Sequence, residues 1–459
     1  MEARKASDSM RSGDEARAVK KREVSSDVTR LLSYLLILLP AALSFLYVHS
    51  FGVDVPYGDT WTMVPLFDKL SAGTLSWSDL WHQHFEHRVF FPRIAMLLLS
   101  VATSFNNVAI MYLIQVCLLI TLIILLLAFK DNIQANLFLF VPISFLVFSL
   151  GQYWNLLVAW SLTFVFVQTF VVLALYLLHV SNRTNFRNPA LSAALITGTV
   201  ASFSSAQGLF VWPAGLLQLL IAPVERSTKK ILAGIWGAAG LVEWIVYFYD
   251  LNIPRHHSER YFLDNPNLGI DYFLTALGGS LIRQQTIALI CGLLLVCLVT
   301  ATLFLVYRAG TLGECSFWIA LISFSFLFLL SILVGRSGMG PENALSPKYP
   351  TFTVLGVIGA YVMLIKLALE VRTRISHILL GSLIVLIVTS IPLSYVEGVD
   401  AGKALEVRRE RAAHVISTYR TQPDEALTVV NRSAWRVREW APILERLDYT
   451  VFARSEKQN

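Results

Sequence analysis

The residues best suited to chemistry in this chain follow its first long apolar stretch. There the segment from Pro56 to Trp61 (PYGDTW) places the carboxylate of Asp59 directly after a Pro/Gly turn. At the surface of a membrane, such a carboxylate lies within reach of a lipid headgroup and can accept a proton from a hydroxyl. The structural alternative is that Asp59 caps a helix starting at Thr60, because Asp is a favoured N-cap residue.

A second polar cluster runs from His82 to Arg88 (HQHFEHR), just before the next apolar stretch. Imidazole and carboxylate are common metal ligands, but the spacing does not match a helical HExxH site. We therefore favour a cluster in which Glu86, His87 and Arg88 orient a phosphate or a sugar hydroxyl. Arg93 follows at the mouth of an apolar helix, where it should be paired or functional unless it snorkels to the headgroups.

Three further polar clusters interrupt the apolar sequence. They are Gln152, Trp154 and Asn155; Arg255, His256 and His257; and the stretch from Gly335 to Tyr349, which includes Arg336 and Lys348. The glycine-rich start of the last stretch (GRSGMG) is not a nucleotide fingerprint, because no strand precedes it. Its backbone amides and Arg336 could approach an anion closely, with an ordinary turn as the alternative.

The elements that position these residues must be membrane helices. Of the 459 residues, 55% are hydrophobic and 15% are charged, with a mean hydropathy of +0.60; soluble proteins have about 25% charged residues. Apolar stretches of roughly 17 to 25 residues, enough to cross a bilayer as helix, recur from Leu31 to Val396. The composition therefore predicts an all-α, polytopic transmembrane bundle.

Charge and cysteine usage exclude other classes. The net charge of +6 does not indicate nucleic-acid binding, because the basic residues form no patch alternating with exposed aromatics. The cysteines, Cys117, Cys291, Cys297 and Cys315, lie in or at the edge of apolar segments without CxxC spacing. We interpret them as packed thiols.

We expect about ten or eleven crossings. The candidate spans are 31–49, 89–105, 108–129, 136–150, 157–180, 190–206, 208–222, 231–249, 285–307, 315–334, 351–369 and 376–396. The basic residues beside them place the tail 1–30 in the cytoplasm, together with the turns around Arg183, Arg226, Arg308 and Arg372. Within the transmembrane domain 31–396, the segments 50–88, 250–284 and 335–350 are then outer loops.

The same rule leaves a parity problem. Four apolar segments lie between the outer Arg88 and the inner Arg183, where an odd number of crossings is required. One of the four must be re-entrant or lie along the interface. If Lys130 is cytoplasmic, the turn around Gln152 and Asn155 faces outward, and we favour this arrangement.

Two polar segments have patterns of their own. Residues 50–88 space Trp61, Trp77 and Trp81 among leucines, which is typical of one or two amphipathic helices on a membrane surface. Residues 397–459 predict a small extracytoplasmic cap of mixed α/β structure, with helices at 401–419 and 434–447 and a short strand at 426–430. This cap is too short for an independent catalytic domain.

Asp59 soon after the first span, the surface-helix loop and the basic/His cluster together resemble integral-membrane glycosyltransferases of the GT-C class. The wider pattern from Tyr57 to Arg93, with 152–155, 204–213 and 335–349, is also similar to a group of bacterial membrane proteins of unassigned activity. The GT-C resemblance implies a polyprenyl-phosphate sugar as donor and an acidic residue in the first outer loop that acts on the acceptor. Many GT-C enzymes carry two adjacent acidic residues here, whereas this chain has Gly58 before Asp59, so dependence on a divalent cation and the acceptor type stay open.

The resemblance implies roles for the polar clusters. Asp59 would be the base, and cations such as Arg336, Lys348, Arg88 or Arg255 would stabilise the leaving phosphate. The full set of expected substrate- or phosphate-binding residues is Glu86, His87, Arg88, Arg93, Gln152, Asn155, Arg255, His256, His257, Arg336, Lys348 and Tyr349. Tyr57, Trp61 and Trp154 would stack on sugars, with an interfacial aromatic belt as the alternative.

The expected setting is a bacterial inner membrane, with the N-terminus cytoplasmic, the site on the outer side, and membrane lipids and the lipid-linked donor as partners. The alternative function is a flippase or transporter for a lipid-linked glycan. A transporter would need polar residues along a path near the bilayer midplane. Here the charges concentrate in outer loops, although Gln207 and Glu243 lie in or near apolar spans.

Overall fold

The computed structural model describes residues 28–453, except 134, 184–188 and 253–260. Over these residues the chain is an all-α bundle in which nine helices are long and apolar enough to cross a membrane, so the protein is an integral membrane protein. Three of the nine are Val28–Phe51, the broken segment Leu137–Leu157, and Ala159–Asn182, which contains most of α8 (Leu162–Arg183). The other six are α5 (Asn107–Asn132), α11 (Arg226–Phe248), α14 (Gln285–Arg308), α15 (Ser316–Arg336), α16 (Pro350–Glu370) and α17 (Arg374–Ser417).

Two shorter apolar helices also run between the ends of the bundle. Helix α9 (Ala190–Ser202) ends beside Trp81, whose ring lies 4.9 Å from that of Phe203. The chain then returns through η5 (Ala206–Phe210) and α10 (Val211–Ile221), which ends at the opposite end of the bundle against Gly313. With the nine long helices, these two make eleven passes within the described residues, in agreement with the expected ten or eleven.

Helix α4 (Phe90–Thr103) resolves the parity problem. It has 14 residues and α9 has 13, so the position of its ends rather than its length sets it apart. Both of its ends lie at one end of the bundle, because Phe91 donates to the carbonyl of Phe203 and Ser104 accepts from Thr450. Helix α4 is thus the apolar segment that fails to span.

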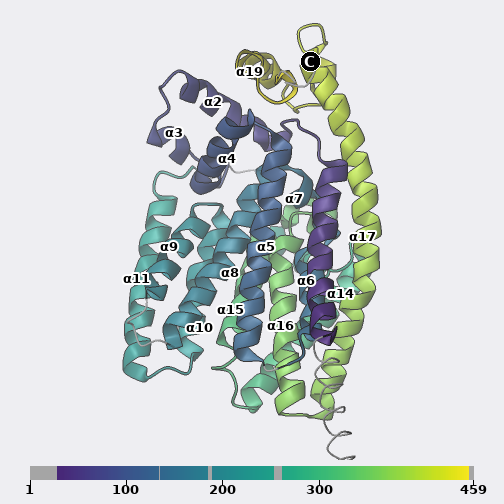
Figure 1. Cartoon of the computed structure of the whole chain (residues 1–459). Coiled ribbons are helices and arrows are strands. Elements are labelled where there is room, and N and C mark those ends of the chain that lie inside the picture. Colours follow the sequence, from purple (N-terminus) through teal and green to yellow (C-terminus); the bar gives the residue numbers. More distant parts are fainter. Residues whose placement is uncertain (1–27, 134, 184–188, 253–260, 454–459) are drawn as a thin grey trace, which may run out of the picture.

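We call the end of the bundle that carries the first loop and the C-terminal helices the cap end; it is at the top in Figure 1. The first loop forms η1 (Gly58–Met63), α2 (Val64–Ser71) and α3 (Trp77–Trp81), so it is helical, as predicted. The later loops at this end form the short helices α12 (Tyr261–Asp264), α13 (Pro266–Gly278), η6 (Ser337–Met339) and η7 (Pro341–Leu345).

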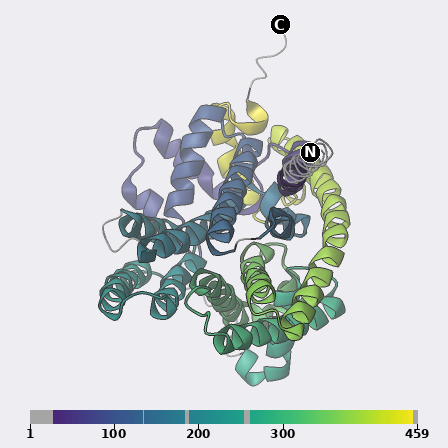
Figure 2. The same cartoon turned by 60° about the horizontal axis from the view of Figure 1, so that its bottom comes forward.

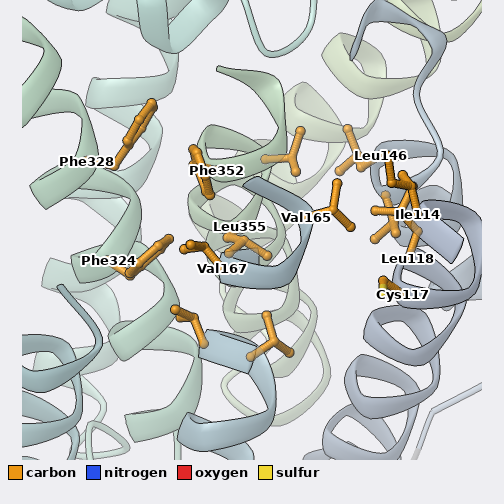
Figure 3. Packing of buried hydrophobic residues seen from close by; sticks show 14 of the residues in the cluster. Ile114, Cys117, Leu118, Leu146, Val165, Val167, Phe324, Phe328, Phe352 and Leu355 are labelled. Carbon is orange, nitrogen blue, oxygen red and sulfur yellow. The ribbon is translucent and has the colours of Figure 1, made fainter. Parts of the chain in front are cut away.

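Helix α16 is the centre of the bundle. Nineteen of its residues are buried, and it packs closely on α15, where Gly356 meets Ser325 and Gly359 meets the carbonyl of Trp318. Figure 3 shows the apolar side chains that fill the space around it, among them Phe324, Phe328 and Phe352. A helix that is apolar on all sides can be buried in this way without exposing polar groups.

Helix α17 differs from the sequence prediction of a break near residue 397. The whole helix is 44 residues long, about 66 Å. It runs along the flank of the bundle beside the N-terminal helix and extends past the end of the bundle (Figures 1 and 2). The hydroxyl of Tyr47 donates to the carbonyl of Gly398 at 2.6 Å, and Gly402 leaves room for the same ring. Pro392 lies inside this helix and Gly398 at the boundary, yet the helix continues through both, so one helix carries the apolar and the charged part.

The C-terminal cap is helical in its described part. Helix α19 (Ala434–Arg446) matches its prediction, but 424–427 form the short helix α18 (Asp424–Leu427) and the prediction of a strand over 426–430 is wrong. A strand needs a partner, whereas Asp424 and Glu425 after Pro423 favour a helix start. The cap is joined to the first loop by an ion pair between Arg446 and Asp68 and by Tyr449, whose ring lies 5.3 Å from that of Phe67.

The orientation of the bundle can be tested by cysteine labelling from outside. We expect an impermeant thiol reagent to label cysteines introduced at Ser78, Ser258, Ser346 and Ser433, because positive-inside logic puts the cap end outside. A cysteine at Ser227, at the opposite end, should stay unlabelled until the membrane is permeabilised. Ser258 lies outside the described residues, while Ser78 and Ser227 are both exposed, so their difference in labelling reports sidedness rather than burial.

The background for this experiment should carry Cys297→Ser, because Cys297 is exposed and the other three cysteines are buried. Labelling of Ser346→Cys only from the cytoplasmic side would contradict the assignment. It would separate Lys348 from the outer face of the membrane.

Candidate active site

A cavity of about 350 Å³ opens at the cap end of the bundle. Its polar lining consists of Asp59, His84, Glu86, His87, Gln207, Arg336, Asn343, Ser346, Lys348 and Tyr349. Its apolar lining consists of Phe85, Trp160, Phe164, Phe328, Ile332, Met339 and Phe352. The structure thus brings six of the residues singled out in the sequence, from three separate segments, around one space.

Asp59 is positioned by the turn that precedes it. Gly58 has a φ of +57°, in the left-handed region that glycine adopts most readily, and it starts η1. Thr60 and Trp61 are buried and anchor the turn. The side chain of Asp59 makes no cap hydrogen bond and lies within the first turn, so the N-cap alternative does not describe it.

The carboxylate of Asp59 lies in a positive environment. His84 Nε2 is 3.7 Å from Asp59 Oδ2. Burial alone would raise the pKa of Asp59, but the imidazole of His84 and the charges of Lys348 and Arg436 outweigh it and hold this pKa below its ordinary value. Asp59 is therefore ionised at neutral pH. Arg436 belongs to α19, so the C-terminal cap contributes charge to the cavity.

The second polar cluster forms a tight loop beside Asp59. His84 and His87 exchange backbone hydrogen bonds of 2.7 and 2.9 Å, and Phe85 at the turn has a φ of 49°. Glu86 forms an ion pair with Arg336 at the end of α15, which ties this loop to the third outer loop. Burial opposes ionisation of Glu86, but His87 and Arg336 lower its pKa below the ordinary value.

His87 lies behind this ion pair as a neutral imidazole. Its Nδ1 accepts from the backbone N–H of Ala206 at 3.4 Å, and its Nε2 lies 3.6 Å from Glu86 Oε1. Burial lowers the pKa of His87 to about 4 against the opposing charge of Glu86. Of the two carboxylates at the cavity, Glu86 is already paired with Arg336, whereas Asp59 faces the cavity and forms no ion pair with an arginine of the described residues.

Lys348 supplies the positive charge on the other side of the cavity. Its Nζ lies 5.5 Å from the ring centre of Trp154 and 5.8 Å from that of Phe164. Burial lowers the pKa of Lys348, and the charge of Asp59 opposes that effect. Beside it, the hydroxyls of Tyr349 and Tyr272 both donate to Asn343 Oδ1, at 2.8 and 2.9 Å.

Gln152 and Asn155 lie outside the cavity lining and instead hold Lys348 in place. Asn155 Nδ2 donates to the carbonyl of Lys348 at 3.0 Å and to Thr351 Oγ1 at 2.6 Å. Thr351 Oγ1 in turn donates to Gln152 Oε1 at 2.6 Å. Gln152 and Asn155 are three residues apart and lie on one side of the turn. That side faces the start of α16.

Arg88 and Arg93 also lie outside the cavity. The guanidinium of Arg88 donates to the carbonyls of Tyr247 at 2.7 Å, Trp81 at 3.3 Å and Tyr249. That of Arg93 donates to Leu80 at 2.9 Å and to His82. Both side chains are buried and bind backbone, which favours a structural role over the predicted phosphate contact. Arg255, His256 and His257 lie outside the described residues.

The aromatic residues of the cavity differ from those expected. Trp61 is fully buried in the core, so it cannot stack on a sugar. Tyr57 packs between Trp154, 5.8 Å away, and the guanidinium of Arg409, 5.3 Å away. The cavity walls are instead formed by Trp160 and Phe164.

Sequence reasoning missed these two aromatic residues because they lie in an apolar run without a polar neighbour pattern. It also left His84, Gln207, Asn343 and Ser346 out of the site. The signal for His84 was present, since it stands two residues before Glu86 in the same polar cluster.

The donor set does not fit a metal ion in the part of the chain that is described. There, no three His, Cys, Asp or Glu side chains converge closely enough to coordinate one. At the cavity, Asp59 and His84 lie 3.7 Å apart and Glu86 and His87 lie 3.6 Å apart, but Glu86 is committed to Arg336. We therefore derive no step through a divalent cation.

Comparisons with known proteins give weak likenesses. No protein-family model matches the chain. An uncharacterised protein of Archaeoglobus fulgidus is 28% identical over 232 residues, covering 45% of this chain and 58% of that protein. A crystal structure of an Archaeoglobus fulgidus oligosaccharyltransferase in complex with zinc and sulfate aligns with a TM-score of 0.43 and 10% identity, covering 80% of this chain and 53% of that one.

The chain thus spans less than two thirds of the length of each of these proteins. The first has no assigned activity, and the structural likeness is too low to carry an argument. The chemistry of the cavity has to be argued from its own residues.

The structural role of Arg88 can be tested by thermal unfolding of the purified protein. Arg88→Ala leaves three backbone carbonyls without their donor, and we expect it to lower stability by on the order of 2 kcal/mol or more. Arg336→Ala is the matched control, because that half-buried guanidinium pairs with a side chain rather than with backbone. Equal melting temperatures for Arg88→Ala and the wild type would contradict this role.

Proposed function

We propose that the protein is a membrane glycosyltransferase that moves a sugar from a polyprenyl-phosphate carrier to an acceptor hydroxyl at the outer membrane surface. The observation that carries the proposal is the cavity at the cap end, where an ionised carboxylate, Asp59, shares one space with the cations Lys348 and Arg336. Transfer from a phosphate carrier requires both kinds of group, a base for the acceptor and positive charge for the leaving group.

Each charged group has a role in an inverting transfer. Asp59 takes the proton of the acceptor hydroxyl as the acceptor oxygen bonds to the anomeric carbon. The bond from that carbon to the phosphate oxygen breaks, and its electron pair stays on the phosphate. Lys348 and Arg336 stabilise the added negative charge, while Glu86 holds Arg336 at the rim.

The uncharged lining suits a sugar. Gln207, Asn343 and Ser346 offer amide and hydroxyl groups for hydrogen bonds, and Trp160 and Phe164 offer apolar faces. The described residues contain no strand from which an α/β nucleotide-binding domain could be built. A donor carried by a membrane lipid therefore suits this chain better than a soluble nucleotide sugar.

The packing beneath the cavity favours chemistry over transport. Phe328 and Phe352 form its floor, with ring centres 4.7 Å apart, and Phe324 packs 6.1 Å below Phe352. Figure 3 shows Val167 and Leu355 filling the next layer. A polar substrate passing through the bundle would have to displace this apolar core, whereas a transferase needs access from one side only.

The proposal is tested by lipid analysis and by direct assay. A deletion strain should accumulate a polyprenyl-phosphate sugar or a lipid-linked glycan that lacks one residue, measured by mass spectrometry of extracted lipids. Purified protein should release sugar from one member of a panel of radiolabelled polyprenyl-phosphate hexoses and pentoses. Unchanged lipids together with no turnover of any donor would overturn the proposal.

Asp59→Asn should abolish transfer while expression and membrane insertion stay normal. The substitution removes the base with almost no change in volume, and general-base catalysis contributes roughly 10²- to 10⁴-fold. The measurement is the initial rate with the active donor, normalised to folded protein. Substantial remaining activity would rule out Asp59 as the base, and Asp68→Asn, in the same loop but outside the cavity, is the control.

Lys348→Ala and Arg336→Ala should weaken use of the donor rather than folding. Loss of one charged hydrogen bond to the phosphate corresponds to about 10- to 100-fold in kcat/KM for the donor. Titration of the donor at fixed acceptor, beside a melting curve for each variant, separates the two effects. If neither variant changes the donor dependence, these cations do not bind the phosphate.

A further inference from the structure

His84 and Asp59 form a pair whose members differ in access to the cavity. The side chain of Asp59 is 42% exposed, whereas that of His84 is 8% exposed. His84 Nε2 is buried without a hydrogen-bond partner and lies 3.7 Å from Asp59 Oδ2. An acceptor in the cavity can therefore contact the carboxylate of Asp59. A proton from the acceptor can reach His84 Nε2 by way of that carboxylate.

The imidazole of His84 is held rigidly in this position. Its backbone is paired on both sides with that of His87, and its ring lies 4.5 Å from Trp160 and 4.8 Å from Phe85. A histidine kept only for packing would not need an unpartnered nitrogen directed at a carboxylate. A buried polar atom without a partner calls for a functional explanation or a missing ligand.

We propose that His84 is a proton relay for Asp59: it receives, through the carboxylate, the proton that the acceptor hydroxyl loses. This inference rests on the proposed glycosyl transfer. In the balanced step, the acceptor O–H bond breaks as the new bond to the sugar forms, and the proton passes from Asp59 Oδ2 to the lone pair of His84 Nε2. The electron pair of the broken sugar–phosphate bond leaves with the phosphate, so an imidazolium and a phosphate with one added negative charge remain.

The relay accounts for the poor basicity of Asp59. The cations Lys348 and Arg436, which help to keep this carboxylate ionised, also make it a weak proton acceptor, so a proton would not stay on it. Catalytic contacts are often long without substrate, and closing 3.7 Å to hydrogen-bond distance needs a shift of about 1 Å.

The other charged groups that face His84 do not offer a competing acceptor. Glu86, on the same loop, is paired with Arg336. His87 is engaged elsewhere: its Nδ1 accepts from the backbone N–H of Ala206 in η5, and its Nε2 lies toward Glu86. Lys348, from the loop before α16, is a cation and favours the ionised form of Asp59.

The relay is tested by the pH dependence of transfer. In the wild type, protonation of His84 from solvent blocks the relay, so the rate should fall as the pH is lowered. His84→Gln should lower kcat by about 10- to 100-fold with the donor KM unchanged. The rate of this variant should also lose the acid limb of the pH profile, that is, the fall in rate as the pH is lowered. His82→Gln is the matched control, because His82 is exposed in the same segment and outside the cavity lining. Its profile should match the wild type.

A second measurement does not depend on turnover or on a His84 variant. The ¹⁵N resonances of the His84 imidazole in isotope-labelled protein, followed by NMR against pH, report when this imidazole loses its proton. In Asp59→Asn the midpoint should move to lower pH, because the neighbouring negative charge is gone. His82 should show no such shift in the same sample.

The outcomes separate the two proposals. Retention of the acid limb by His84→Gln, or an unchanged His84 midpoint in Asp59→Asn, would overturn the relay while leaving transfer standing. A shifted midpoint in a protein that turns over none of the donors would show a coupled pair but overturn the relay of a transfer reaction together with the proposed function.

Discussion

The cavity depends on how buried backbone carbonyls are satisfied at the cap end. The C-terminal ends of α11 and α3 present carbonyls without a partner within their own helix, and the Arg88 guanidinium donates to those of Tyr247, Tyr249 and Trp81. The same residue continues directly from the loop that carries His84 and Glu86. Because these carbonyls need hydrogen-bond donors, Arg88 is held against them, and its position also fixes the loop that faces Asp59.

A second ion pair extends this arrangement across the cavity. Glu86 binds Arg336, so the first loop and the end of α15 are joined, and Lys348 follows on the way into the buried helix α16. Asn155 and Gln152 fix the start of α16 from another direction. Charges from distant segments thus meet over an apolar floor, where low polarity strengthens their interaction.

The C-terminal cap is part of the same end rather than an appendage. Helix α17 is continuous and connects the bundle to the C-terminal cap. An ion pair of 2.7 Å between Arg283 and Glu397 anchors this helix. Within the cap extension Arg409 is almost wholly buried and lies over the ring of Tyr57, two residues before Asp59. The cap thereby contacts the turn that presents the carboxylate, and Arg436 adds its charge from α19.

The sequence by itself determined the class of fold, because length and apolarity of a helix suffice to decide whether it can cross a bilayer. It also determined which loops carry charge, and hence that Asp59, Glu86, His87, Arg336 and Lys348 were candidates. Only the tertiary structure decided which polar residues face the cavity. Arg88 and Arg93 look like phosphate ligands in the sequence, yet they satisfy backbone carbonyls, since a guanidinium can donate to a carbonyl oxygen as well as to a phosphate. Trp160 and Phe164 gain their places through packing between segments far apart in the chain, which no local pattern records.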